Sequence, residues 1–233
     1  MKLKEDSSIQ KLRGAYYTPL PLAEMMVKLF ENRTDCKNVL EPSCGDGVFL
    51  DALIKADCIK QCTSIEAVEI DGAEAKKVEE RMKSYKNVKV INEDFFDFYR
   101  ANNTSVQYDL ILGNPPYIRY QYLEEHQREL MSDILTSQGM KANKLVNTWV
   151  GFIVSCVNML SDNGKIVFVI PAEIMQVAYA EDLRLFLSNN LSKITLITFE
   201  ELVFPDIEQE IVVFIGEKGD EEIASLLLSD KKI

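Results

Sequence analysis

Short apolar runs alternate with longer amphipathic segments along most of the chain. Runs rich in Val, Ile, Leu and Phe that are bounded by polar or turn residues indicate buried strands. We expect strands at 39–41, 64–70, 88–92, 108–112, 164–171, 194–199 and 211–215. Segments with helical spacing of their apolar residues indicate helices that bury one face. We expect these at 20–31, 48–56, 72–84, around 95–99, 146–160 and 172–188.

Strands that alternate with helices predict an α/β fold with a mostly parallel, doubly wound sheet. The last two strands are joined by an acidic, proline-containing connection that is too short for a crossover helix. They should form a hairpin, which makes the final strand of a seven-stranded sheet antiparallel. The chain shows no repeats or linkers, so we expect residues 1–233 to form a single domain.

Two polar segments lie outside this pattern. Residues 1–11 are polar and are predicted to be a flexible tail. Residues 118–145 contain positive and negative charges that nearly cancel. This segment is either a mobile lid that becomes ordered when substrate binds or a solvated helix.

Composition limits the class of protein. The five cysteines are irregularly spaced and accompanied by a single histidine, which favours reduced thiols in a cytosol over a disulfide framework or a metal site. The N-terminus lacks the apolar core of a secretory signal, and the longest mostly apolar helical stretch, 148–160, is too short to span a bilayer. We therefore expect a cytoplasmic protein that binds neither metal nor membrane.

The formal net charge of −11 is unfavourable for binding nucleic acid, because phosphate contacts require Lys and Arg. Either nucleic acid is not the substrate, or the main DNA-binding part lies elsewhere.

Candidate chemistry lies where the predicted strands end, which is where open α/β sheets bind ligands. After strand 39–41, Gly45 and Gly47 allow a ligand to approach the backbone closely. The carboxylates of Glu41 and Asp46 would attract a cation and repel a pyrophosphate. This loop suits a molecule with an amino-acid end and a sulfonium; the alternative is a glycine turn with solvated acids.

The next two strands also end in acidic residues. Glu69, followed by Ile70, can accept hydrogen bonds from ribose hydroxyls, whereas Asp71 is better suited to capping the following helix. Asp94 can accept a hydrogen bond from an exocyclic amine, and Phe95 can cover a purine face. Alone this last signal is weak, because phenylalanines are more often core residues.

Strand 108–112 ends in the loop Gly113-Asn114-Pro115-Pro116-Tyr117. The prolines lack amide hydrogens and fix their own φ, so the loop is rigid and its carbonyls cannot enter a helix. The Asn114 amide oxygen, the Pro115 carbonyl and the Tyr117 ring suit a planar substrate that carries an NH2 group. The alternative is an ordinary proline turn with a tyrosine packed over it.

Together these segments resemble the ordered motif series of adenine-N6 DNA methyltransferases. The similarity is to the gamma class of bacterial restriction-modification enzymes, of the Eco57I and TaqI kind, and covers nearly the whole chain. It rests on the segments 14–19, 41–50, 68–71, 93–98, 114–117, 164–171 and 199–205. The resemblance implies the class I S-adenosylmethionine-dependent methyltransferase fold and transfer of a methyl group from S-adenosylmethionine to adenine N6 in DNA.

The resemblance also implies roles for individual residues. Cofactor binding falls to Tyr17, Thr18, Glu41, Gly45, Gly47, Glu69, Ile70, Asp94 and Phe95. Within this set, Tyr17 and Thr18 lie along the methionine part and Glu69 binds the ribose. Asn114, Pro115 and Tyr117 are the catalytic residues, and Tyr117 and Phe204 stack on the target base. Since a base inside a duplex cannot reach such a pocket, duplex DNA would be bound with the adenine flipped out.

Such enzymes normally carry a separate target-recognition domain, which this sequence does not show, so a recognition domain or specificity subunit is an expected partner. Three alternatives remain open. The Asn-Pro-Pro-Tyr loop also serves protein glutamine-N5 methyltransferases, although segment 14–19 and the lack of a preceding helical domain argue against one. The others are an RNA adenine methyltransferase and a non-catalytic cofactor-binding subunit of a restriction complex.

Overall fold

The computed structural model describes residues 17–30, 37–141, 146–175, 180–199, 210–219 and 225–231, and for the last of these ranges the backbone alone. The predicted tail at 1–11 and the predicted stacking residue Phe204 lie outside these ranges. The first half of the described chain contains α2 (Leu20–Lys28), β1 (Asn38–Glu41), α3 (Val48–Lys55), β2 (Ser64–Glu69), α4 (Gly72–Met82), β3 (Val88–Asn92), α5 (Phe95–Asn102) and β4 (Tyr108–Gly113).

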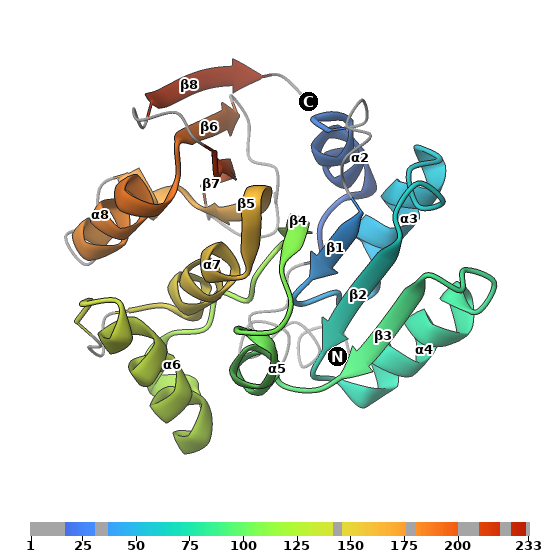
Figure 1. Ribbon diagram of the computed structural model, residues 1–233, viewed down its shortest axis with the longest axis horizontal. Helices are drawn as coiled ribbons and strands as arrows, with labels where there is room; N and C mark the ends of the chain where they lie inside the picture. Colours follow the sequence, from blue (N-terminus) through green and yellow to red (C-terminus); the bar gives the residue numbers. More distant parts are fainter. Residues whose placement is uncertain are drawn as a thin grey trace, which may run out of the picture.

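The second half begins with three helical segments and ends mostly in strands (Figure 1). Its elements are the 3-10 helix η1 (Tyr120–Tyr122), α6 (Glu125–Ser137), α7 (Thr148–Asn158), β5 (Leu160–Pro171), the 3-10 helix η2 (Ala172–Met175), α8 (Glu181–Asn190), β6 (Lys193–Phe199), β7 (Ile211–Glu217) and β8 (Ser225–Lys231).

The strands form one eight-stranded sheet in the order β3-β2-β1-β4-β5-β7-β6-β8. Its pairs are parallel, except that β7 runs antiparallel to both β5 and β6. This confirms the predicted mostly parallel sheet with a reversed β7. The expected count of seven was wrong, because β8 adds a further parallel strand beside β6.

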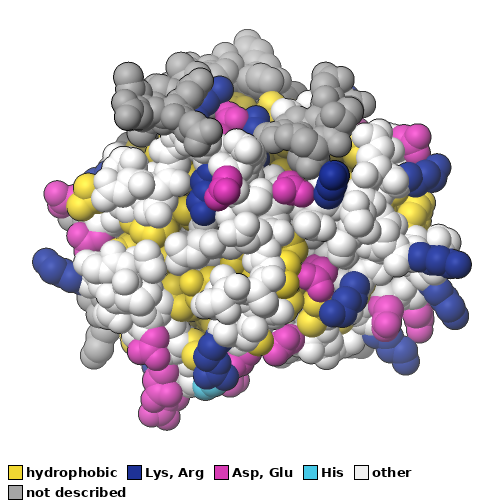
Figure 2. All heavy atoms as spheres, in the orientation of Figure 1, with side chains coloured by type: hydrophobic (Ala, Val, Ile, Leu, Met, Phe, Trp, Pro, Cys, Tyr) yellow, Lys and Arg dark blue, Asp and Glu magenta, His cyan; other side chains and the backbone are white. Residues whose placement is uncertain are grey.

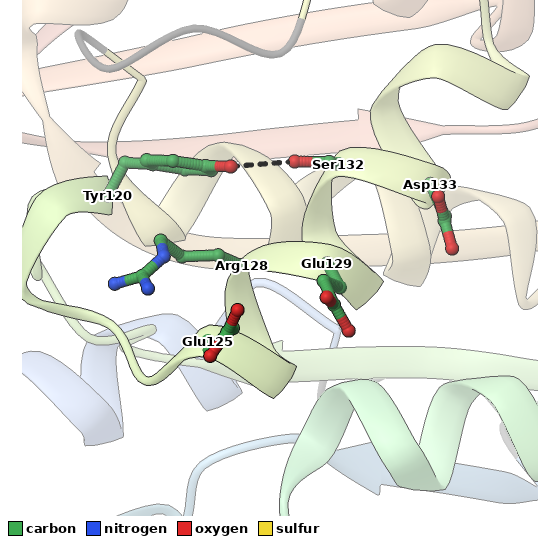
Figure 3. Close-up of a pocket in the computed structure, with 6 residues that line it drawn as sticks. All are labelled: Tyr120, Glu125, Arg128, Glu129, Ser132 and Asp133. Carbon is green, nitrogen blue, oxygen red and sulfur yellow. Dashed lines mark hydrogen bonds between the residues drawn. The ribbon is translucent and has the colours of Figure 1, made fainter.

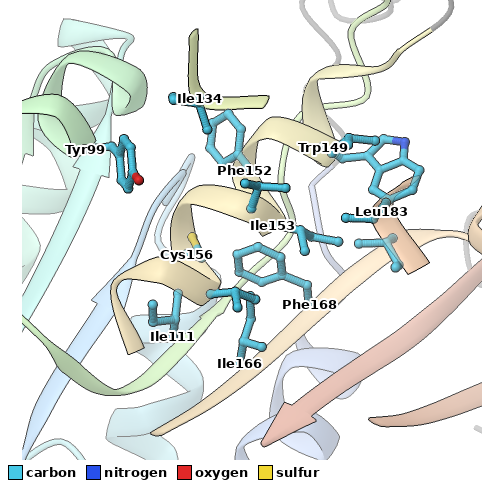
Figure 4. Close-up of a cluster of buried hydrophobic side chains, with 14 of the residues drawn as sticks. Tyr99, Ile111, Ile134, Trp149, Phe152, Ile153, Cys156, Ile166, Phe168 and Leu183 are labelled. Carbon is cyan, nitrogen blue, oxygen red and sulfur yellow. The ribbon is translucent and has the colours of Figure 1, made fainter. Parts of the chain in front are cut away.

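Helices cover both faces of the sheet. This is expected for a mostly parallel sheet, because successive residues of each strand point to opposite faces and both faces are apolar. In β4, Ile111 packs under α5, α6, α7 and α8, whereas Leu110 and Leu112 face α2, α3 and α4. Figure 4 shows the first of these cores, where Trp149, Phe152 and Ile153 of α7 pack above strand side chains such as Phe168. From β1, the strands β2 and β3 are added one after the other toward one edge of the sheet, and β4 then pairs with the other side of β1. The strand order therefore reverses between β1 and β4.

Two predicted helices differ from the structure. The expected helix at 172–188 is replaced by η2 and α8, with residues 176–179 outside the described ranges. The expected helix at 146–160 ends at Asn158, and β5 begins at Leu160. Tyr108 pairs with Leu160 ahead of a register shift, so β5 includes polar residues that look like a turn in the sequence.

The polar segment 118–145 contains η1 and α6, with 142–145 outside the described ranges. The apolar side chains of α6 are buried with α7 in the core, among them Met131 and Leu135 at 0% exposure. This helix is therefore part of the core and not merely solvated. Among the described residues, no helix combines the length and apolar character needed to cross a membrane.

Asp109 connects the amino-terminal ends of three neighbouring strands. Its Oδ2 accepts hydrogen bonds from the backbone N–H groups of Lys37 and Asn38, both at 2.9 Å. Its Oδ1 accepts one from the Ser161 hydroxyl at 3.0 Å. One carboxylate thus holds β4 in register with β1 and β5.

We expect Asp109→Ala to lower the free energy of unfolding by about 2–4 kcal/mol, since three hydrogen bonds to a charged group are lost together. Urea denaturation measures this, and Asp133→Ala on the exposed face of α6 is the control, with an expected change within about 0.5 kcal/mol. Equal effects of the two substitutions would contradict the role assigned to Asp109.

Candidate active site

The loops after β1 and β4 meet where the strand order reverses. The Ser43 hydroxyl donates a hydrogen bond to the backbone carbonyl of Asn114 at 3.2 Å. Open α/β sheets bind their ligands at this position, beyond the carboxyl ends of the strands. The structure therefore brings together two loops that lie far apart in the sequence: the glycine loop, residues 42–47, and the Asn-Pro-Pro-Tyr loop, residues 114–117.

The glycine loop is held in a conformation that needs glycine. Gly45 and Gly47 have φ values of 52° and 79°, in the left-handed region that other residues adopt at a cost. A Cβ at Gly47 would also collide with the Arg81 guanidinium and press on Val78 of α4. The Cys44 N–H donates to the Val68 carbonyl at 2.9 Å, which ties the loop to β2.

Glu69 fixes the same loop from the end of β2. Its carboxylate accepts hydrogen bonds from the Gly45 N–H at 2.7 Å and from the Asp71 N–H at 2.8 Å. Its side chain is therefore rigid beside the loop. Asp71 caps α4 by accepting from the N–H groups of Ala73 and Glu74, which confirms the role expected for it. By contrast, Ile70 is 61% exposed at this edge.

Glu41 is a carboxylate buried without compensation. It is 1% exposed, and neither of its oxygens has a hydrogen-bond partner among the described residues. Burial raises its pKa well above the ordinary 4.5, and the neighbouring carboxylates of Asp46, Glu69 and Asp51 raise it further, while Arg81 acts in the opposite direction. Burial also raises the pKa values of Asp46 and Glu69. Among the described residues, the carboxylates near Glu41 outnumber the nearby positive charges.

Tyr17 and Thr18 precede α2 and border the glycine loop. Thr18 is buried, whereas Tyr17 is 46% exposed. The Tyr17 ring lies beside Gly45, at 3.8 Å from where a Cβ of that residue would be. Tyr17, Gly45 and Glu69 thus form one wall of the site.

Asp94 and Phe95 follow β3. The Asp94 Oδ1 caps α5 by accepting from the N–H groups of Phe96 and Asp97, at 2.8 and 3.4 Å. Its Oδ2 accepts from the Gln127 amide of α6 at 2.6 Å. The Phe95 ring is buried and stacks on Phe152 at a centroid distance of 4.5 Å, so it is a core ring in this structure.

The Asn-Pro-Pro-Tyr loop is fixed on several sides. Pro115 is buried, as is the Oδ1 atom of the partly buried Asn114. The Tyr117 hydroxyl donates to the Val169 carbonyl of β5 at 3.1 Å. The Ile118 carbonyl accepts from both the N–H and the hydroxyl of Thr148, at 2.9 and 2.7 Å. The loop is thereby anchored to β5 and to the start of α7.

Sequence reasoning missed three residues that shape this site: Ser43, Gln127 and Thr148. Each acts through a hydrogen bond to a distant segment, and none stands out in a motif. Among the described residues, no group of His, Cys, Asp and Glu has the arrangement of a metal site.

A separate hollow lies between η1 and α6 (Figure 3). It is lined by Tyr120, Glu125, Arg128, Glu129, Ser132 and Asp133. The Tyr120 and Ser132 hydroxyls are 2.9 Å apart, and Arg128 donates to the Leu123 carbonyl at 2.6 Å. The hollow shares no residue with the strand-end loops. On the face shown in Figure 2, the described Lys and Arg side chains lie scattered among Asp and Glu side chains.

Comparison with known proteins gives a consistent result. The family model of the Eco57I restriction-modification methylases matches residues 26–204. The Type II methyltransferase M.HincII of Haemophilus influenzae is 33% identical over 215 residues, which make up 92% of this chain and 39% of that protein. The chain spans 35–39% of the length of M.HincII and of the similar relatives M.AccI and M.HindII.

Solved structures share the fold at low identity. The DrdV–DNA complex matches with a TM-score of 0.74 and 14% identity, over 95% of this chain and 28% of that chain. A Listeria monocytogenes protein assigned to the class I S-adenosylmethionine-dependent methyltransferases matches with a TM-score of 0.70 and 15% identity, over 93% of this chain and 66% of that one. The fold is that of class I methyltransferases, as expected from the sequence. The chain belongs to the family of Eco57I restriction-modification methylases.

Proposed function

We propose that this chain transfers a methyl group from S-adenosylmethionine to N6 of an adenine in DNA, within a restriction-modification system. The observation that carries the proposal is the junction of the Asn-Pro-Pro-Tyr loop with the acidic glycine loop, joined by the Ser43–Asn114 hydrogen bond. It sets groups suited to an amine beside groups suited to a cation. M.HincII, a Type II methyltransferase by name, and DrdV, whose structure contains DNA, are consistent with DNA as the substrate.

The residues after β1 and β2 fit this cofactor. The buried Glu41 carboxylate has no partner among the described residues, and a ligand with an ammonium and a sulfonium would supply the missing positive charge. The methionine part would lie near the backbone of Gly45 and Gly47, beside Tyr17 and Thr18. The Glu69 carboxylate, with Ile70 next to it, would accept the ribose hydroxyls. When bound, the cofactor supplies a methyl group activated by its sulfonium.

The target amine would be held by the loop after β4. Adenine N6 is a poor nucleophile because its lone pair is delocalised into the ring. Two acceptors, the Asn114 side-chain oxygen and the Pro115 carbonyl, would hold its two N–H bonds and favour a tetrahedral nitrogen. Such a site acts mainly by positioning and preorganised polarity. Tyr117 and Phe204 would stack on the flipped base.

We further propose that a separate basic portion or subunit reads the DNA sequence. The net charge of −11 is unfavourable for phosphate contacts, and the basic side chains on the face shown in Figure 2 are scattered among acidic ones. The site needs no metal, because positioned acceptors are sufficient for the transfer.

The methyl acceptor can be tested with labelled S-adenosylmethionine offered alongside duplex DNA, RNA or a release factor. We expect label in DNA at adenine N6, with a loss of about 100-fold or more in Asn114→Ala, since a preorganised polar contact at the reacting atom is removed. Asn190→Ala, at the exposed end of α8, is the matched control and should retain full transfer. Label that enters only RNA or the release factor would refute DNA as the substrate.

Cofactor affinity should depend on pH through Glu41. Because its pKa is raised, the Glu41 carboxyl keeps its proton at pH values where an ordinary Glu is ionised. Binding of a cationic ligand beside Glu41 would release that proton. We therefore expect the Kd for S-adenosylmethionine, measured by calorimetry, to fall as pH rises from the ordinary range of a Glu carboxyl through the raised pKa of Glu41.

In Glu41→Gln the affinity at pH 8 should be about 10- to 100-fold lower, with a flatter pH profile, because the charge-assisted contact is lost. The control is Glu80→Gln on the exposed surface of α4. A Glu41→Gln profile that matches wild type would exclude Glu41 from the cofactor site.

A further inference from the structure

Gln127 links α6 to the carboxylate of Asp94. Its Nε2 donates to the Asp94 Oδ2 at 2.6 Å, and its Oε1 accepts from the backbone N–H of Glu124 at 3.1 Å. One end of the amide therefore faces an acceptor and the other a donor, so only one orientation of the amide satisfies both contacts. Gln127 is also the third residue of α6 and part of its capping box. Its position is fixed by the start of the helix itself.

The remaining contacts of Asp94 leave one acceptor position. Its Oδ1 accepts the two N–H groups of Phe96 and Asp97 that cap α5, and its Oδ2 accepts Gln127. A carboxylate offers about four lone-pair positions. Donors from the described residues occupy three, so within that part of the chain Oδ2 retains one, and the Gln127 contact helps to fix the orientation of the carboxylate.

We infer that Gln127 is a positioning residue for recognition of the cofactor adenine: it orients the Asp94 carboxylate so that its remaining lone pair receives the exocyclic amine. This inference rests on the proposed function and on the sequence-based expectation that Asp94 accepts a hydrogen bond from the exocyclic amine of the cofactor adenine. Gln127 belongs to the segment after the catalytic loop, and α6 is anchored by buried residues such as Met131 and Leu135. The adenine end of the cofactor site is therefore held by α6, a helix that lies outside the loops after β1, β2, β3 and β4.

A neighbouring contact supplies a matched control. His126, the residue before Gln127, places its Nε2 at 3.0 and 2.9 Å from the two carboxylate oxygens of Asp97. This pair also joins the first turn of α6 to that of α5, but it does not involve Asp94. A role for Gln127 that is only structural should be shared by His126, whereas a role in recognition should not.

The test compares two ligands that differ at the exocyclic group. S-adenosylhomocysteine carries the amine, and S-inosylhomocysteine carries an oxygen acceptor that a carboxylate disfavours. Calorimetry should show that wild type prefers the adenosyl ligand. In Gln127→Leu we expect the adenosyl ligand to bind about three- to tenfold more weakly, with little change for the inosyl ligand, so that selectivity falls. His126→Ala should keep the wild-type selectivity.

A double substitution tests whether Gln127 acts through Asp94. In an Asp94→Asn background, Gln127→Leu should cause no further loss of selectivity, because the orienting contact has nothing left to orient. Equal weakening of both ligands in Gln127→Leu, or a lower melting temperature with unchanged selectivity, would overturn the inference and leave Gln127 as a helix contact. Failure of the wild-type chain to bind either ligand would instead refute the proposed function.

Discussion

The parallel pairing of β4 with both β1 and β5 is the constraint on which the site depends. Because β1 and β4 run in the same direction, their carboxyl ends meet at one edge, and the Glu41 and Asn114 loops lie side by side. The Asp109 carboxylate holds the opposite ends of the same strands in register. A slip of one residue in β4 would turn Ile111 and Leu112 to the wrong faces and displace the Asn114 loop as well.

Much of this arrangement follows from the sequence. The apolar runs of β4 and β5 predict buried strands, and their alternation with helices predicts a parallel sheet. Given that sheet, residues that end successive strands must share an edge, so Glu41, Glu69, Asp94 and Asn114 could be grouped without coordinates. The reversed direction of β7 also follows from its short connection to β6.

What the sequence could not give depends on distant contacts. β8 is a short leucine run among charged residues, and leucine carries little strand preference, so only pairing with β6 identifies it. The helical period of α6 is obscured by its polar residues, although α7 buries its apolar side. The two hydrogen bonds of Gln127 join segments that no local pattern connects. For the same reason, the sequence identifies Glu41 as acidic but not as buried, nor as lacking a hydrogen-bond partner among the described residues.

The acidic side chains in and near the site oppose folding in a pH-dependent way. Glu41, Asp46, Asp51 and Glu69 all have pKa values raised mainly by burial, so above the ordinary carboxylate range the folded chain binds more protons than the unfolded one. The free energy of unfolding then falls as pH rises through the raised pKa values.

Arg81 offsets part of this repulsion through its ion pair with Asp51, with Nε and Oδ1 3.2 Å apart. The remaining unfavourable free energy comes from burying these carboxylates, and positive charge placed beside them would reduce it. Under the proposed function, the acidic site and the net charge of −11 favour binding of a cationic cofactor. Charge that favours a cationic cofactor also repels phosphate, so affinity for a duplex has to come from elsewhere than this pocket.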